Sequence, residues 1–154
     1  MGGISMKGNR IKNSHWHDYE GNDPCFFKTN QKLHFDKTEI DGYRVASLSF
    51  SKDDYERLVY QDPIGCKGFN QVTIGLVIRG NDIDEINYKI GFYDENNSCL
   101  DVRFQNIASE IKPTFKRICV TYPIPSHTHS VKVGWEFKGI VTGVTIFHPS
   151  VDLY

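Results

Sequence analysis

Residues 131–154 carry the clearest alternation of apolar and polar positions in the chain. On one side of an extended chain lie the apolar residues Val131, Val133, Trp135 and Phe137, and on the other lie Lys132, Gly134, Glu136 and Lys138. This period of two is typical of a strand with one buried face. We therefore expect a strand ending at Gly139 and a second strand over 142–147. The apolar C-terminus should be held in a sheet, beside an N-terminal strand.

Shorter runs of the same kind predict strands along most of the chain. The strongest lie at 69–79 and 85–94, with these residues facing inward: Val72, Ile74, Leu76, Ile78, Ile86, Tyr88, Ile90 and Phe92. Further strands are expected at 9–13, 25–28, 32–35, 43–50, 57–61, 99–105 and 114–122. Turn residues such as Asp41-Gly42 separate them. Roughly ten short strands at spacings of about 8–12 residues, with no convincing helix, predict an all-β antiparallel sandwich of the jelly-roll type.

Composition narrows the class of protein. The chain has 154 residues, enough for one domain with its own core, which we place at 9–154 after an N-terminal tail of residues 1–8. Met1 to Ser5 is interpreted as a cloning remnant.

A net charge of -1 without a basic stripe argues against nucleic-acid binding. No apolar run approaches the ~20 residues that span a bilayer, so no membrane insertion is expected, and no signal peptide is evident.

The four cysteines, Cys25, Cys66, Cys99 and Cys119, include no C-x-x-C pair. This spacing gives no support to a zinc ribbon or a thioredoxin-like site. An even number permits two disulfides, but a domain of this size does not require them. Free, mostly buried thiols are the favoured interpretation.

The order of these segments resembles a known family. An N-terminal Asn-aromatic segment (residues 11–16) is followed by 43–50, 58–61 and the long strand 69–79. Then come an aspartate turn at 90–96, a strand ending in Tyr122-Pro123, and the closing segments 131–137 and 144–153. The arrangement resembles jelly-roll carbohydrate-binding modules with a galactose-binding-domain-like fold, found on glycoside hydrolases and in phage tail proteins that bind saccharides. The resemblance implies a non-catalytic, lectin-like domain of a larger extracellular or virion-associated protein.

Many modules of this family hold a structural Ca²⁺ between an acidic residue near the first strand and an aspartate in the last. Here His15-Trp16-His17 and His148-Pro149 stand where the resemblance leads us to expect acidic residues. Asp18 and Asp152 remain the candidate Ca²⁺ ligands. Two carboxylates are few for an ion that takes about six to eight oxygens.

Other chemistry has weaker support. His15 and His17, with His127 and His129, could supply four imidazoles to a transition metal. No cysteine or helical His-Glu motif accompanies them, so two polar loops are the simpler interpretation.

The acidic pairs Asp53/Asp54, Asp82/Asp84 and Asp94/Glu95 lie in predicted turns, where carboxylates are usually solvated. Glycosidases need two carboxyls about 5–10 Å apart in a cleft. No nucleophile motif and no phosphate loop occur, and no enzymatic activity is expected.

Aromatic and amide side chains are the better indication of a binding site. Sugar rings stack on aromatic faces, and amides and charged groups hydrogen-bond their hydroxyls. The candidate ligand-binding residues are Trp16, Tyr19, Tyr43, Gln61, Arg79, Asn87 and Tyr93. Lys89, Tyr55, Tyr60 and Gln105 belong to the wider set, whereas the phase of Trp135 predicts a core position. We expect the site among the first hundred residues.

The sequence thus favours a non-catalytic module that binds a polysaccharide or a cell-surface glycan. Two alternatives stay open: a structural, adhesion or virion subunit that binds protein, and a small glycoside-hydrolase-like enzyme.

Overall fold

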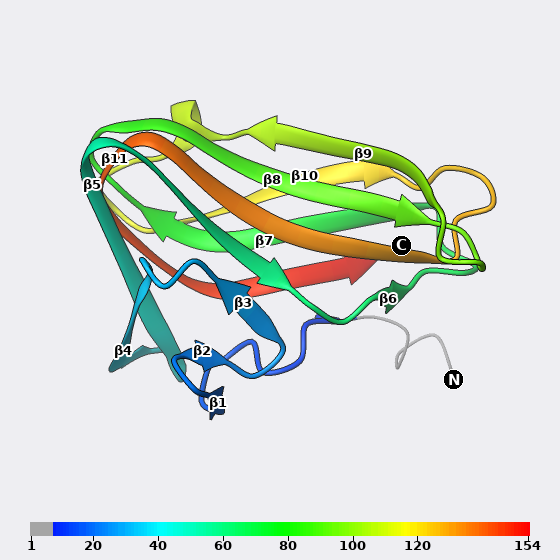
Figure 1. The fold of residues 1–154 in the computed structure, drawn as a ribbon, viewed down its shortest axis with the longest axis horizontal. Helices are drawn as coiled ribbons and strands as arrows, with labels where there is room; N and C mark the ends of the chain where they lie inside the picture. Colours follow the sequence, from blue (N-terminus) through cyan, green and yellow to red (C-terminus); the bar gives the residue numbers. More distant parts are fainter. Residues whose placement is uncertain (1–7) are drawn as a thin grey trace.

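The computed structural model describes residues 8–154, which form a sandwich of two antiparallel β layers (Figure 1). The strands are β1 (Tyr19–Glu20), β2 (Asp23–Pro24), β3 (Phe27–Thr29), β4 (His34–Ile40), β5 (Tyr43–Tyr60), β6 (Ile64–Gly65), β7 (Gln71–Arg79), β8 (Ile83–Tyr93), β9 (Cys99–Asn106), β10 (Lys116–Pro123) and β11 (Ser130–Leu153). One short 3₁₀ helix, η1 (Ala108–Glu110), precedes β10. The predicted all-β antiparallel sandwich is confirmed.

Two long strands build both layers. The first half of β11 pairs with β8 and with the second half of β5, whereas its second half pairs with β7 and with the first half of β5. The first layer therefore runs β9-β8-β11-β5-β3, and the second runs β10-β7-β11-β5-β4. In Figure 1 both long strands turn from one layer into the other at the same end of the molecule.

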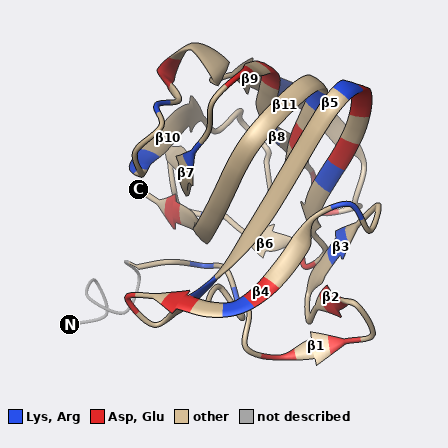
Figure 2. Ribbon diagram, turned by 90° about the vertical axis from the view of Figure 1, so that its left-hand side faces the viewer, with Lys and Arg blue, Asp and Glu red and all other residues tan. Residues whose placement is uncertain are grey.

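Glycines make this turn possible in β11. Gly139 and Gly143 have φ angles of +82° and +63°, a region that side chains with a Cβ rarely adopt. The pairing register of β11 with β5 shifts at the same place. The prediction that Gly139 ends a strand was wrong: the strand bends there and continues. Residues 53–60 belong to the continuous strand β5, which carries charged residues at its bend (Figure 2).

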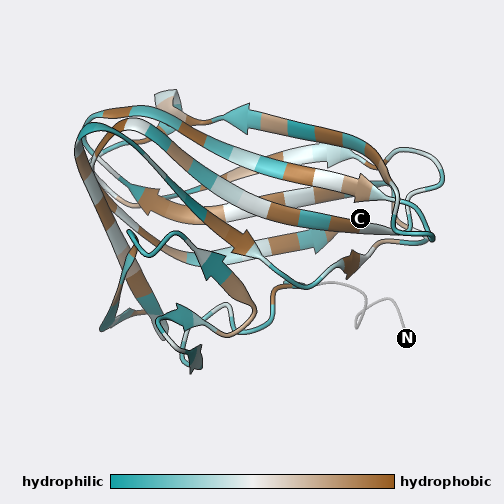
Figure 3. Cartoon of the chain, in the orientation of Figure 1, coloured by the Kyte–Doolittle hydropathy of each residue, from teal (hydrophilic) through white to brown (hydrophobic). Residues whose placement is uncertain are grey.

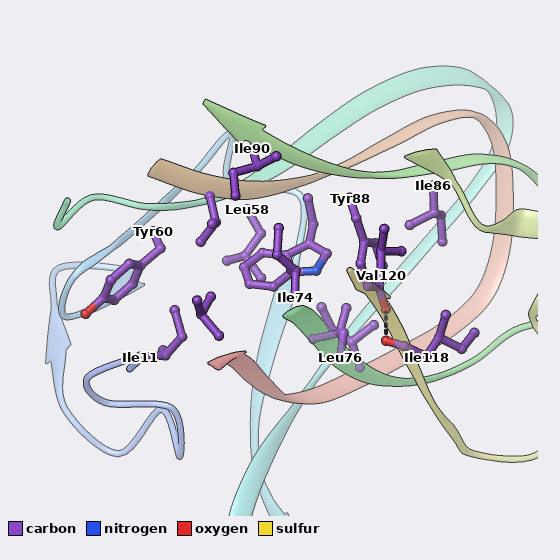
Figure 4. Close-up of a cluster of buried hydrophobic side chains, with 14 of the residues drawn as sticks. Ile11, Leu58, Tyr60, Ile74, Leu76, Ile86, Tyr88, Ile90, Ile118 and Val120 are labelled. Atoms are coloured by element: carbon purple, nitrogen blue, oxygen red, sulfur yellow. Dashed lines mark hydrogen bonds between the residues drawn. The ribbon is translucent and has the colours of Figure 1, made fainter. Parts of the chain in front are cut away.

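The core lies between the layers and follows the predicted alternation, visible as bands of hydropathy along each strand (Figure 3). All eight residues predicted to face inward from β7 and β8 are buried, and so is Trp135. The Tyr88 hydroxyl donates to the Ile118 carbonyl at 2.8 Å, which joins β8 to β10 across the core (Figure 4). The Tyr122 hydroxyl returns a bond of 2.9 Å to the Tyr88 carbonyl.

The N-terminal segment differs from the prediction. Residues 9–11 have no regular secondary structure and residues 12–13 belong to a turn, so the predicted strand at 9–13 was wrong. The C-terminal half of β11 lies instead between β7 and β5. The two ends of the chain still meet, because the Arg10 amide donates to the Val151 carbonyl and the Asn9 side chain accepts from the Val151 amide. Most of the tail predicted at 1–8, residues 1–7, lies outside the described residues.

The cysteines agree with the prediction in part. All four are free, but only Cys66 is buried. Cys99 and Cys119 lie on β9 and β10, the outermost strands of the two layers, and are exposed. The prediction that the thiols are mostly buried was therefore wrong. None of the described helices has the length and hydrophobicity to cross a bilayer.

Candidate functional site

A groove of about 370 Å³ lies on the outer face of the first layer. Its outward-facing residues come from β5, β11, β8 and β9, and they are Tyr55, Arg57, Val59, Lys89, Gly91, Tyr93, Val102, Lys132, Gly134 and Glu136. They alternate with core residues along each strand, so the strand pattern that builds the core also builds the groove. We call this set the groove.

Two glycines keep the floor of the groove low. Gly134 on β11 lies directly between Val59 of β5 and Lys89 of β8, and Gly91 on β8 lies opposite Lys132 of β11. Each glycine is therefore paired with a lysine on the neighbouring strand. A side chain at either position would rise into the space that the lysines border.

Tyr93 leans back along β8 over Gly91. A Cβ at Gly91 would lie 2.9 Å from Tyr93 Cε1 and 3.1 Å from its hydroxyl oxygen, so the ring occupies space that only glycine leaves free. Lys132 Nζ lies 4.4 Å from the centroid of the same ring, a cation–π contact. The ring and the ammonium group together form one end of the groove.

Glu136 is the centre of a polar cluster in the groove. It accepts a hydrogen bond of 2.9 Å from the Tyr55 hydroxyl and forms ion pairs with Lys89 at 3.3 Å and Lys138 at 3.7 Å. Partial burial acts to raise the pKa of Glu136, but the bonds from Tyr55 and Lys89 outweigh it, so the pKa lies below its usual value. Burial and the neighbouring carboxylate raise the pKa of Tyr55 to about 12. Glu136 is thus charged and Tyr55 protonated at neutral pH.

Strand β9 borders the groove with exposed apolar side chains. Val102 pairs with Gly91 and Phe104 pairs with Lys89, so both face the groove side of the layer. They are 54% and 63% exposed. The polar residues of this strand, Asp101, Arg103 and Gln105, pair with core positions of β8 and so take the opposite side. This reverses the usual arrangement of a sandwich strand and leaves an aromatic ring in solvent.

The structure places the residues predicted to bind ligand in several different regions. Tyr93 lines the groove, together with Lys89 and Tyr55 of the wider set. Asn87 is on the same face of β8 but is buried. Arg79 lies over the ring of Phe115 at 4.5 Å, and Gln61 is exposed just after β5.

The three aromatic residues predicted nearer the N-terminus lie elsewhere. Trp16 has no exposed surface and packs edge-on against Phe27 and Phe35. Tyr43 is stacked between His15 and His148, at centroid distances of 4.1 and 3.9 Å. Tyr19 is half-buried beneath the guanidinium of Arg44. These residues and the groove do not form one site, and Trp16 in particular offers no surface to a ligand.

The sequence analysis overlooked most of the groove. Arg57, Phe104, Lys132 and Glu136 were not among the candidate ligand-binding residues, and three of the four lie beyond the first hundred residues. The alternation of inward and outward residues along each strand was sufficient to identify these positions as outward. Lys132 and Glu136 alternate with Val131, Val133 and Trp135, so an outward direction for them follows from the core positions.

The described residues do not fit the calcium site that the resemblance implies. Across residues 8–154, no three His, Cys, Asp or Glu side chains gather as a metal site would require. Asp152 lies in β11 opposite Thr73, and Asp18 lies in the loop before β1, where its carbonyl accepts from Cys25. His15 and His17 have ring centroids 5.5 Å apart, but within the described part of the chain they belong to no set of three such ligands. We therefore derive no role for a metal.

No protein-family model matches the sequence, and no curated protein matches it. Solved structures do match in fold. One is the enzymatically active domain of tailspike protein 4 of bacteriophage CBA120, with a TM-score of 0.66 and 14% identity, over 95% of this chain. This chain spans only 21% of that tailspike chain.

Two isolated carbohydrate-binding modules match over nearly their whole length. TmCBM61, solved in complex with β-1,4-galactotriose, has a TM-score of 0.61 and 10% identity, over 96% of this chain and 99% of its own. The family 11 module of the cellulase Lic26A-Cel5E of Clostridium thermocellum has a TM-score of 0.55 and 14% identity, over 96% and 93%. The chain therefore has the jelly-roll β-sandwich fold of carbohydrate-binding modules, as the resemblance in its sequence predicted.

Proposed function

We propose that the protein is a non-catalytic carbohydrate-binding module and that the groove holds a polysaccharide or a surface glycan. The observation that carries the proposal is the composition of the groove. It combines a tyrosine ring at one end, exposed Val102 along one side with Phe104 on its border, and hydrogen-bonding groups on a floor opened by Gly134. Sugars need this combination, because they present apolar C–H faces and a ring of hydroxyls. The shared fold with known modules supports the proposal.

A role in hydrolysis has less support from the groove. Glu136 is the only carboxylate among the residues that line it within the described chain, whereas glycosidases use two. Two of the acidic residues predicted in turns bind main-chain groups: Asp94 accepts from the amides of Asn96 and Ser98, and Asp84, which lies in β8, accepts from that of Ile140. We therefore propose binding without catalysis.

Titration calorimetry against a set of plant and bacterial wall polysaccharides tests the proposed function. We expect binding to at least one polymer, and Phe104→Ala should weaken it about tenfold, or ~1.4 kcal/mol, through loss of a stacking surface. Tyr154→Ala is the matched control, because Tyr154 is 59% exposed but its main chain pairs with Gln71 of β7 in the opposite layer. Binding by no polymer, or equal losses in both variants, would count against the groove.

A second candidate function is contact with another protein through β9. Among the strands of residues 8–154, β9 pairs only with β8, and it exposes Leu100, Val102 and Phe104. An exposed, apolar outer strand is a common site of pairing between chains. Light scattering coupled to size exclusion distinguishes the two functions, since a stable oligomer without sugar that Val102→Lys converts to a monomer favours the structural role.

A further inference from the structure

The groove carries more positive than negative charge, and this excess is local. Its lining includes the three basic residues Arg57, Lys89 and Lys132 and the single acidic residue Glu136. The whole chain is balanced, with 18 basic and 19 acidic residues. The composition of the protein therefore does not account for the excess in the groove.

Two of the three basic groups have no carboxylate partner. Lys89 is paired with Glu136, but none of the ion pairs within residues 8–154 involves Arg57 or Lys132. Lys132 contacts the Tyr93 ring, which is neutral and therefore does not compensate the ammonium charge. Arg57 lies directly opposite Glu136 in the pairing of β5 with β11, yet that carboxylate is taken by Tyr55, Lys89 and Lys138.

We infer that the groove selects a carbohydrate with anionic substituents, such as a polymer of uronic acids. The inference rests on the proposed function and names its ligand class. Each acidic group would meet an unpaired cation of the groove, and Arg57 can bind a carboxylate or sulfate through two parallel hydrogen bonds. The Tyr93 and Phe104 rings supply the flat surfaces that a sugar needs and that a simple anion does not.

The pairing of glycine with lysine across the strands fits the same ligand. Gly91 lies opposite Lys132, and Gly134 lies opposite Lys89. At Gly134 the absence of a side chain lets a chain of sugars approach the floor beside Lys89. At Gly91 it makes room for the Tyr93 ring, which borders the same groove beside Lys132. A neutral ligand would use the hydrogen bonds but would leave the charge of Lys132 and Arg57 uncompensated.

Matched pairs of polymers test the inference. Polygalacturonate and polymannuronate are compared with the same polymers after reduction of their carboxyl groups, and dextran sulfate is compared with dextran. At low salt, we expect at least one acidic polymer to bind about tenfold more tightly than its neutral counterpart, with affinity falling as NaCl is raised. The carboxylated and sulfated pairs show which anion is preferred.

Charge variants locate the effect. Arg57→Gln and Lys132→Gln should each weaken the acidic polymer about fivefold and leave the neutral one nearly unchanged. Lys116→Gln is the control, because it removes the same charge from β10 in the opposite layer. Circular dichroism and urea unfolding confirm that each variant is folded.

The failures can be told apart. Equal binding of acidic and neutral polymers, both weakened by Phe104→Ala, would overturn the inference and leave the proposed function standing. Binding of poly-glutamate as tight as that of the acidic polymers would also overturn it, because the groove would then recognise charge without sugar. Binding of no polymer at all would remove the proposed function and the inference together.

Discussion

Glycines without a side chain shape the groove as much as the larger residues that line it. Gly91 leaves the space that the Tyr93 ring occupies, and Lys132 fixes that ring from the side. Gly134 does the same for the middle of the floor, between Val59 and Lys89. Gly91, Tyr93, Lys132 and Gly134 are not part of the hydrophobic core cluster.

Gly91→Ala tests the role of this space. The new methyl group would lie 2.9 Å from Tyr93 Cε1, closer than carbon atoms approach, so the ring must swing away. We expect glycan affinity to fall about fivefold while the free energy of unfolding changes by less than about 1 kcal/mol, because the moving group is a partly exposed side chain. Calorimetry and urea unfolding measure the two effects. A loss of stability with unchanged affinity would contradict this account of the floor.

At the level of elements, β5 and β11 determine where the groove can form. Each strand turns from one layer into the other. The second half of β5 and the first half of β11 supply the floor of the groove, and their other halves belong to the opposite layer. The loop between β3 and β4 is tied to this frame by Glu56 of β5. Its buried carboxylate accepts from the amides of Asn30, Lys32 and Leu33 at 2.6–2.7 Å.

Glu56→Ala should therefore be strongly destabilising. Three backbone N–H groups would lose their acceptor, and each unsatisfied donor costs about 1–3 kcal/mol when buried, so we expect a loss on the order of 3 kcal/mol or more in the free energy of unfolding. Glu39→Ala, at an exposed site on β4, should change it by less than about 0.5 kcal/mol. Urea unfolding of the two variants measures both changes in the free energy of unfolding. Similar small effects for both variants would show that the loop does not depend on the carboxylate.

The sequence was sufficient for the core and for most of the strands, because alternation between apolar and polar residues directly reports which face is buried. It was insufficient where a contact joins distant segments. The bend of β11 at Gly139 resembled a strand end, since a glycine with positive φ is common to both. Trp16, within a polar loop, seemed available to a ligand, but Phe27 and Phe35 enclose it.

The groove was harder to predict than the fold for a related reason. Its residues are outward on four strands that are far apart in sequence, and only the pairing of β5, β11, β8 and β9 brings them together. Tyr93 was identified because it is aromatic and outward in phase. Lys132 and Glu136 were passed over because charged residues on an outer face are common and usually only solvated.

At the scale of the whole molecule, the two layers have different outer faces. The first layer carries the groove, with unpaired cations and exposed rings. On the second, Arg117 of β10 donates to Ser150 at 2.9 Å and contacts His148 at 2.6 Å. Burial and the nearby Arg117 lower the pKa of His148 to about 4, so this ring is neutral at physiological pH. On this face Arg117 binds Ser150 and His148, whereas Arg57 and Lys132 of the groove have no carboxylate partner among the described residues.

The central claim is that the groove of the first layer binds a glycan, and a two-dimensional ¹H–¹⁵N NMR titration tests it most directly. Uniformly labelled protein is titrated with the polysaccharide that binds best in calorimetry. The account predicts that amide shifts concentrate at Arg57, Gly91, Tyr93, Phe104 and Lys132, with little change at Arg117 and His148 on the opposite face. Shifts centred on the second layer, or spread evenly over both, would contradict it.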